Sequence, residues 1–102
     1  MISIAVPSQF NDSEIPVEPG VYLFKDDTDT VLYVGKAKNL RSRISSYFSP
    51  SNHSHKTQHL IPQIRGIDWI VVYNEVEALL LENKLVKQYM PKYNMTLKDA
   101  KS

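Results

Sequence analysis

The sequence contains no cysteine, only three glycines and no long apolar run. The absence of cysteine excludes disulfide bonds, thiolate metal ligands and a thiol nucleophile, and it favours an intracellular, cytoplasmic protein. No apolar stretch approaches the roughly 20 residues that a membrane-spanning helix needs, and the first residues do not resemble a secretion signal. A chain of 102 residues has room for one domain with one modest core, and we expect a monomer that does not bind membranes.

The chain also has little net charge, only +1, whereas a protein that binds nucleic acid by itself usually carries a clear basic excess. The cations are concentrated, however: residues 36–43 contain four of them and no acid, and acids gather at 26–29 and 75–82. This asymmetry is typical of a phosphate-binding surface beside a carboxylate site, and equally of a solvated helix face. If DNA is the ligand, this stretch or other domains must supply the affinity.

Local patterns predict an α+β chain with elements in the order β-β-α-α-β-α. Residues 21–25 and 31–35 are rich in β-branched and aromatic side chains, and the turn-forming residues 26–29 between them predict a hairpin. With a four-residue loop, Phe24 faces Val31 and Tyr22 faces Tyr33, so both phenols project from one face of the sheet. Such a pair can be purely structural, because aromatic cross-strand pairs stabilise hairpins by up to about 1 kcal/mol.

Helical patterns cover most of the remaining chain. Pro62 should kink or shorten one helix, because proline removes a backbone donor. Asn74 with Glu77 forms a capping-box pattern at the start of the last helix, and Pro91 follows its end. The expected elements are helices over 40–48 and 55–65, a loop over 49–54, a third strand over 68–73 and a helix from 75 to about 89.

Glu82 lies in the middle of the apolar stripe of that last helix. A carboxylate buried there without a partner would cost several kcal/mol. Glu82 is therefore either in a buried salt bridge with one of the chain's twelve lysines and arginines, or it is a metal ligand or general base. Its apolar neighbours, all within roughly 100° of it on the helical wheel, are Ala78, Leu79, Leu81, Leu85, Val86 and Tyr89.

Other polar side chains should converge on the same place. Arg43 and Tyr47 lie one helical turn apart on the flank of the first helix, and Lys36 follows the second strand. Two phenols, a lysine, an arginine and one carboxylate suit hydrolysis of a phosphodiester bond with one metal ion, with the basic groups holding phosphate and a phenol hydrogen-bonding or deprotonating the water. The sequence has no Ser/His/Asp triad, glycine-rich phosphate loop or two-metal carboxylate cluster.

Two triplets, Gly20-Val21-Tyr22 and Tyr33-Val34-Gly35, resemble the paired motif of the GIY-YIG endonucleases, with valine in place of isoleucine in each. Within that superfamily the resemblance is closest to the nuclease domain of the UvrC family, and it extends from about Pro19 to the last residue. Further shared segments are Pro19–Leu23, Leu32–Arg41, Ser45–Phe48, Glu77–Asn83 and Pro91–Asn94.

The resemblance implies a small three-stranded, largely antiparallel sheet flanked by helices, and a single Mg²⁺ or Mn²⁺ ion bound by Glu82. Tyr33 is favoured over Tyr22 as the general base, because Lys36 nearby would lower its pKa. The implied catalytic residues are Tyr22, Tyr33, Lys36, Arg43, Tyr47 and Asn94, and the basic stretch offers Lys36, Lys38, Arg41 and Arg43 as DNA contacts.

In the UvrC family this domain cuts DNA on the 3′ side of a lesion, after a UvrB-like partner has loaded it. The resemblance therefore implies a nuclease domain over residues 19–94, an extended arm over 1–18, and a segment over 95–102 that leads to further domains, which bind the partner. A stand-alone mini-nuclease is one alternative. A non-catalytic DNA- or protein-binding module of the same fold is another, but such a module predicts that a motif residue would be replaced, and none is.

The three histidines all fall in one segment, at positions 53, 55 and 59. His55 and His59 have the spacing of a metal-binding pair on a helix, but the sequence offers no cysteine to complete a zinc site. A solvated segment that binds phosphate weakly is favoured over zinc.

Overall fold

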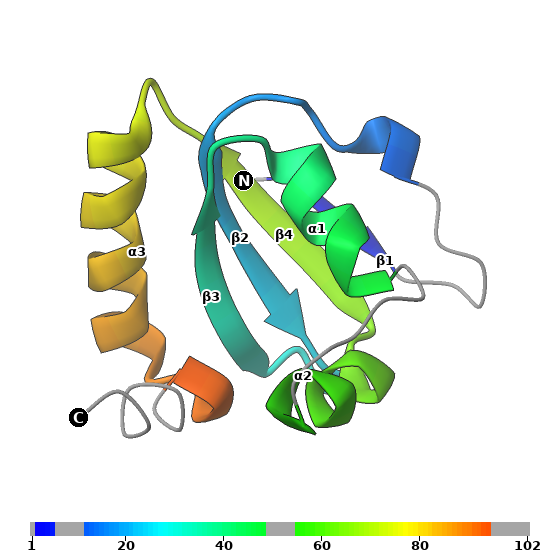
Figure 1. The fold of residues 1–102 in the computed structure, drawn as a ribbon. Coiled ribbons are helices and arrows are strands. Elements are labelled where there is room, and N and C mark those ends of the chain that lie inside the picture. The colour runs from blue at the N-terminus through cyan, green and yellow to red at the C-terminus, as the bar shows by residue number, and fades with distance from the viewer. Residues whose placement is uncertain (1, 6–11, 49–54, 95–102) are drawn as a thin grey trace.

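The structure, a computed structural model, describes residues 2–5, 12–48 and 55–94. Four strands form one antiparallel sheet in the spatial order β1-β4-β2-β3, with α1 and α2 on one face and α3 on the other (Figure 1). The strands are β1 (Ile2–Ala5), β2 (Gly20–Lys25), β3 (Val31–Ala37) and β4 (Gly66–Val71). The helices are α1 (Leu40–Phe48), α2 (His55–Leu60) and α3 (Glu75–Tyr89), with short 3₁₀ helices η1 (Asp12–Glu14) and η2 (Ile61–Gln63).

The predicted α+β class, the three predicted strands and their antiparallel arrangement are confirmed. The strand expected at 68–73 lies two residues earlier in the chain, and Pro62 does divide the second helix into α2 and η2. The fourth strand, β1, was missed. It lies in the segment that was expected to be an extended arm, and it pairs with β4. The alternation of Ile2, Ser3 and Ile4 is a strand pattern that could have predicted it. The loop expected at 49–54 lies outside the described residues.

The hairpin has a different register from the predicted one. Tyr22 pairs with Gly35 and Phe24 pairs with Tyr33, so the expected direct pairings of Tyr22 with Tyr33 and of Phe24 with Val31 are wrong. A bulge between Phe24 and Lys25 adds Leu32 as an extra residue on β3. The shift is two residues, so Tyr22 and Tyr33 still project from the same face of the sheet, with ring centroids 6.2 Å apart.

The turn between β2 and β3 contains five residues instead of four, which accounts for one residue of the shift, and the bulge accounts for the other. The carboxylate of Asp26 accepts hydrogen bonds from the backbone N–H groups of Thr28 and Thr30, at 2.9 and 3.0 Å, and from the Thr28 hydroxyl at 2.7 Å. These bonds lower the pKa of Asp26. Asp29 adopts the left-handed conformation, with φ of 67°, which asparagine and aspartate tolerate better than most residues.

Close packing accounts for both glycines of the motif, since neither has a positive φ. A Cβ atom on Gly35 would overlap the phenol end of Tyr22, which lies across the strand pair. A Cβ atom on Gly20 would overlap the carbonyl oxygen of Ile70 and lie 2.7 Å from a methyl group of Leu40 in α1. The lack of a side chain at Gly35 thus leaves room for the Tyr22 ring, and the lack of one at Gly20 leaves room for α1 to pack on β2.

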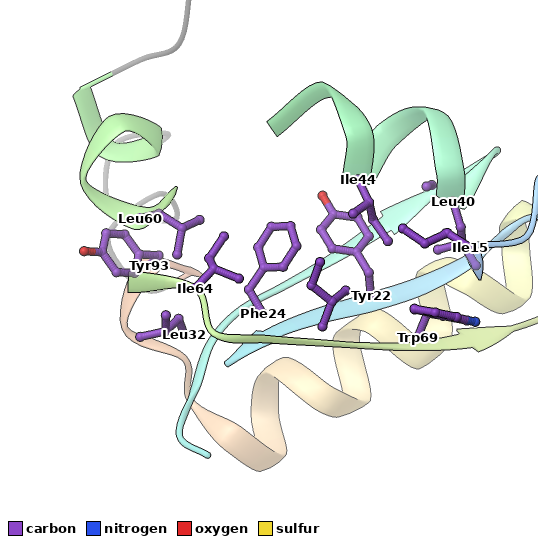
Figure 2. Close-up of a cluster of buried hydrophobic side chains, with 12 residues drawn as sticks. Ile15, Tyr22, Phe24, Leu32, Leu40, Ile44, Leu60, Ile64, Trp69 and Tyr93 are labelled. Carbon is purple, nitrogen blue, oxygen red and sulfur yellow. The ribbon is translucent and has the colours of Figure 1, made fainter. Parts of the chain in front are cut away.

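The larger core lies between the sheet and α1 (Figure 2). Leu40 and Ile44 of α1 are fully buried there, above Tyr22 and close to Trp69 on the sheet. Ile15, from the segment expected to be an extended arm, is buried in the same cluster. This core fixes α1 on the sheet, and with it every functional side chain that α1 carries.

The smaller core lies under α3. The helix begins as predicted, because the Asn74 side chain accepts the Glu77 N–H at 3.0 Å, and it ends at Met90 in the left-handed conformation. Ala78 and Leu85 are buried, but Leu79 and Tyr89 are 44% and 40% exposed, so the buried stripe is narrower than predicted. The reason is that α3 packs on β2 and β3, at one side of the sheet. Within the described residues no helix combines the length and hydropathy of a membrane span.

Candidate active site

Three tyrosines from three elements meet on the face of the sheet that α1 covers. We call Tyr22 of β2, Tyr33 of β3 and Tyr47 of α1 the tyrosine cluster. The hydroxyl groups of Tyr22 and Tyr47 are hydrogen-bonded at 2.9 Å, and their ring centroids are 5.9 Å apart. Tyr22 is only 2% exposed, whereas Tyr33 and Tyr47 are half-buried. The sequence predicted this group of three, and the structure brings it together.

Burial favours the protonated form of two phenols of the cluster, Tyr22 and Tyr33. It raises the pKa of Tyr22 well above the ordinary value of 10.0, Tyr47 and Tyr33 add to the rise, and Arg43 opposes it. The pKa of Tyr33 is raised by burial first, then by Tyr47 and Glu82, and Arg43 again opposes the rise. The cation that lowers the pKa of Tyr33 is thus Arg43, whereas the sequence argument assigned that effect to Lys36.

Glu82 is half-buried on α3 and lies close enough to Tyr33 to raise its pKa. Among residues 2–5, 12–48 and 55–94 its carboxylate makes no ion pair, so the buried salt bridge considered from the sequence is not formed there. A half-buried carboxylate without a cationic partner has oxygen lone pairs to offer to a divalent cation. The same described residues contain no group of three or more His, Asp or Glu side chains that could hold a metal.

An open pocket of about 390 Å³, which we call the basic pocket, lies between β3, α1 and the start of α3. Arg43 connects it to the tyrosine cluster, because this side chain lines the pocket and also lowers the pKa of Tyr22 and Tyr33. Lys36 and Lys38 line it too, as the sequence led us to expect. The full lining is Lys36, Ala37, Lys38, Asn39, Ser42, Arg43, Ser46, Glu75 and Ala78.

Four polar lining residues of the basic pocket were missed by sequence reasoning: Asn39, Ser42, Ser46 and Glu75. Ser42 and Ser46 are one helical turn apart and adjoin Arg43 on α1, which is a signal that could have found them. Glu75 carried no signal, because its place beside the lysines depends on the packing of α3 against β3.

Asn94 holds the outer edge of β3. Its side-chain oxygen accepts the Val34 N–H at 2.7 Å, and its amide nitrogen donates to the Val34 carbonyl oxygen at 2.8 Å. β3 is an edge strand, so both Val34 groups need a partner from outside the sheet. The amide thus extends the sheet by one set of hydrogen bonds and supports the strand that carries Tyr33. The structure places Asn94 at the outer edge of β3, with both polar atoms of its side chain hydrogen-bonded to Val34.

Arg41 does not reach the basic pocket. Its guanidinium donates hydrogen bonds to the carbonyl oxygens of Ile15 at 2.7 Å and Ser13 at 3.2 Å, and so ties α1 to η1 and to the residue that follows it. Of the three histidines, only His59 has a described side chain, and it is exposed. The side chains of His53 and His55 lie outside the described residues, so the interpretations of that segment stay open.

Comparison with known proteins gives one consistent result. Residues 18–95 match the family model of the UvrC-like GIY-YIG domain. The UvrABC system protein C of Methanococcus maripaludis is 55% identical over 90% of this chain and 18% of its own length. That of Methanospirillum hungatei is 60% identical over 86% of this chain and 17% of its own length. The chain therefore spans less than a fifth of these relatives.

A solved structure agrees. The GIY-YIG N-terminal endonuclease domain of UvrC from Thermotoga maritima, bound to its catalytic divalent cation, magnesium, superimposes with a TM-score of 0.70 and 43% identity. The superposition covers 78% of this chain and 85% of that domain. The residues matched by the family model include the tyrosine cluster and Glu82. The chain belongs to the family of UvrC-like GIY-YIG domains.

Proposed function

We propose that this chain is a DNA endonuclease domain that hydrolyses one phosphodiester bond with one divalent ion, Mg²⁺ or Mn²⁺. The observation that carries the proposal is the position of Glu82, whose carboxylate lies beside Tyr33 and makes no ion pair within the described residues. The related domain from Thermotoga maritima, an endonuclease bound to magnesium, supports it.

The residues present fit such an ion. Magnesium retains several waters and is commonly bound by one or two carboxylates together with substrate phosphate oxygens, so a single half-buried glutamate is a suitable protein ligand. When bound at Glu82, the ion would neutralise negative charge that develops on the phosphate during hydrolysis.

The remaining roles follow from exposure and charge. Lys36 and Arg43 line the basic pocket and bind the phosphate, and the guanidinium of Arg43 can donate two parallel hydrogen bonds to it. Tyr33 is the phenol that we assign to the attacking water, because it is half-buried, whereas Tyr22 is only 2% exposed. Because burial raises the pKa of Tyr33, its protonated hydroxyl can hydrogen-bond the water. To take the proton of that water, Tyr33 must first lose its own proton to solvent, and positive charge near the hydroxyl favours the resulting phenolate.

The wider role that we propose is the incision on the 3′ side of a lesion in nucleotide excision repair. The names of the relatives support it. Residues 19–94 would act as a monomeric catalytic unit in the cytoplasm, on DNA that a UvrB-like protein has loaded through other regions of a longer protein. A stand-alone nuclease would cut undamaged DNA equally well.

Nicking of supercoiled plasmid DNA with Mg²⁺ or Mn²⁺, with and without a chelator, tests the proposal. Glu82→Gln should abolish nicking and leave the fold intact, because it removes the metal ligand and a poorly compensated charge together. Glu77→Gln is the matched control, since Glu77 lies on the same helix but accepts the Tyr73 N–H, a bond that an amide oxygen preserves.

Two outcomes would overturn parts of the proposal. Nicking by Glu82→Gln at the wild-type rate would show that Glu82 is not the metal ligand. A wild-type domain that binds DNA but cuts it with neither ion would be the non-catalytic module that keeps this fold.

A further inference from the structure

The basic pocket contains an acidic residue that phosphate binding does not require. The Lys38 Nζ atom lies 3.9 Å from a carboxylate oxygen of Glu75, across the pocket from α1. Both side chains are well exposed, Lys38 by 80% and Glu75 by 63%, so the pair lies at the pocket mouth. The other polar side chains of the lining are basic, hydroxyl or amide groups.

We infer that the basic pocket is a second phosphate subsite, which holds a DNA backbone phosphate other than the one being cut, and that Glu75 competes with this phosphate for Lys38. The inference rests on the proposed function, because it assigns the ligand to the DNA strand that the nuclease cuts. It adds a site and a competing residue that the cutting reaction itself does not need.

The spacing along α3 separates the two phosphates. Glu75 precedes Glu82 by seven residues, two helical turns on the same side of the helix, or about 10 Å at 1.5 Å per residue. A phosphate at Lys38 is therefore not the one at Glu82. One DNA strand carries a phosphate for about every 3.4 Å of duplex axis, so a nearby phosphate of the same strand can reach the pocket. Lys36 and Arg43 line the pocket and belong to the candidate active site as well.

The energetics favour displacement of Glu75 by phosphate. An exposed ion pair between flexible side chains is weak, because water screens it and ordering both chains costs entropy. A phosphate in this subsite gains the charge of Lys38 and shares the charges of Lys36 and Arg43 with the phosphate being cut. Among the described residues, Glu75 forms an ion pair with Lys38 alone. Glu75 lies in the first turn of α3, where the helix dipole stabilises a carboxylate that has lost its partner.

A binding experiment without cleavage tests the inference. The protein is titrated against a fluorescent duplex oligonucleotide in a chelator, across roughly 50 to 200 mM salt. Glu75→Gln should bind about two- to fivefold more tightly at low salt, because Lys38 no longer has a competitor. Lys38→Ala should bind more weakly and lower the slope of log affinity against log salt by about one. In the Lys38→Ala background, Glu75→Gln should have a much smaller effect.

Glu77→Gln is the control for charge alone. It makes the same change in net charge in the same turn of α3, but Glu77 does not line the pocket. An equal gain in affinity for Glu75→Gln and Glu77→Gln would overturn the inference, and so would an unchanged affinity of Glu75→Gln or an unchanged salt slope of Lys38→Ala. Because nothing is cut in this assay, a failure of the subsite is distinguishable from a failure of Glu82 to support nicking.

Discussion

Replacing Gly35 by alanine should damage the site although glycine has no functional group. The added Cβ atom would overlap the Cζ and hydroxyl oxygen of Tyr22 and lie 2.9 Å from a second ring atom, Cε1. The Tyr22 ring has no room to move away, because it is 2% exposed and packs against Phe24 and Tyr47, with ring centroids 5.1 and 5.9 Å away. The substitution must therefore displace the ring or separate β2 from β3.

The magnitude follows from two opposing effects. Replacing glycine by alanine at a compatible position stabilises a protein by about 0.4–1 kcal/mol, because the unfolded chain loses freedom. Overpacking a well-filled core costs about 1–3 kcal/mol. The net loss should be about 1–2 kcal/mol, which lowers the Tm of a domain of this size by roughly 5–15 °C. Displacing Tyr22 also breaks its 2.9 Å hydrogen bond to Tyr47, and misplacement by about 1 Å can cost on the order of 100-fold in rate.

Thermal unfolding of a double-mutant cycle with Tyr22→Leu measures the clash directly. Leucine lacks the phenol end that the new Cβ atom would overlap, so Gly35→Ala should become neutral or slightly stabilising in that background. Nicking should stay lost, because the Tyr22 hydroxyl is absent. If Gly35→Ala costs the same stability with and without Tyr22, the overlap with the phenol is not its cause and the reasoning is refuted.

Three further predictions concern other parts of the fold. Tyr33→Phe should lower the nicking rate far more than DNA affinity, because its hydroxyl acts at the reacting phosphate, and equal losses would contradict that role. Asn94→Ala should lower the free energy of unfolding by about 2–4 kcal/mol, because it leaves the N–H and C=O of buried Val34 unpaired. Asn94→Asp should also destabilise the fold, because a carboxylate oxygen would face the Val34 carbonyl oxygen, and denaturant unfolding measures both variants. The pKa of Lys25 is raised mainly by its 2.6 Å contact with Asp68. The stability that this ion pair gives the fold is therefore complete below the ordinary lysine pKa of about 10.4, and it is lost as pH rises through the higher pKa of the folded state. The stability difference between wild type and Asp68→Asn should therefore shrink in alkali, and a constant difference would exclude this linkage.

Features with local causes were predictable from the sequence. The apolar spacing of residues 40–48 gave the bounds of α1, and the capping pattern at Asn74 gave the start of α3. Both signals depend on side chains within four residues of one another, so no knowledge of the rest of the chain is needed.

Features that depend on contacts between distant segments were not predictable in the same way. The sequence shows Arg41 as one cation among four in residues 36–43, and only the fold directs its guanidinium to the carbonyl oxygens of Ile15 and Ser13. Asn94 reaches Val34 across 60 positions of the chain. The Lys38–Glu75 pair likewise joins β3's end to α3. Charge and motif identify such residues, but their partners follow from how helices pack on the sheet.

The hairpin register shows why a wrong structural detail left the site prediction intact. A turn of five residues instead of four and a bulge at Leu32 together moved Tyr33 from its predicted place opposite Tyr22 to a place opposite Phe24. Side chains alternate between the faces of a strand, so a displacement by two residues returns each side chain to the face it would have had. A displacement by one residue would have turned Tyr33 toward α3 and separated it from Tyr22 and Tyr47. The extra turn residue shifts the register by one residue, and the bulge shifts it by one more. The bulge therefore keeps the phenols on the face that α1 covers.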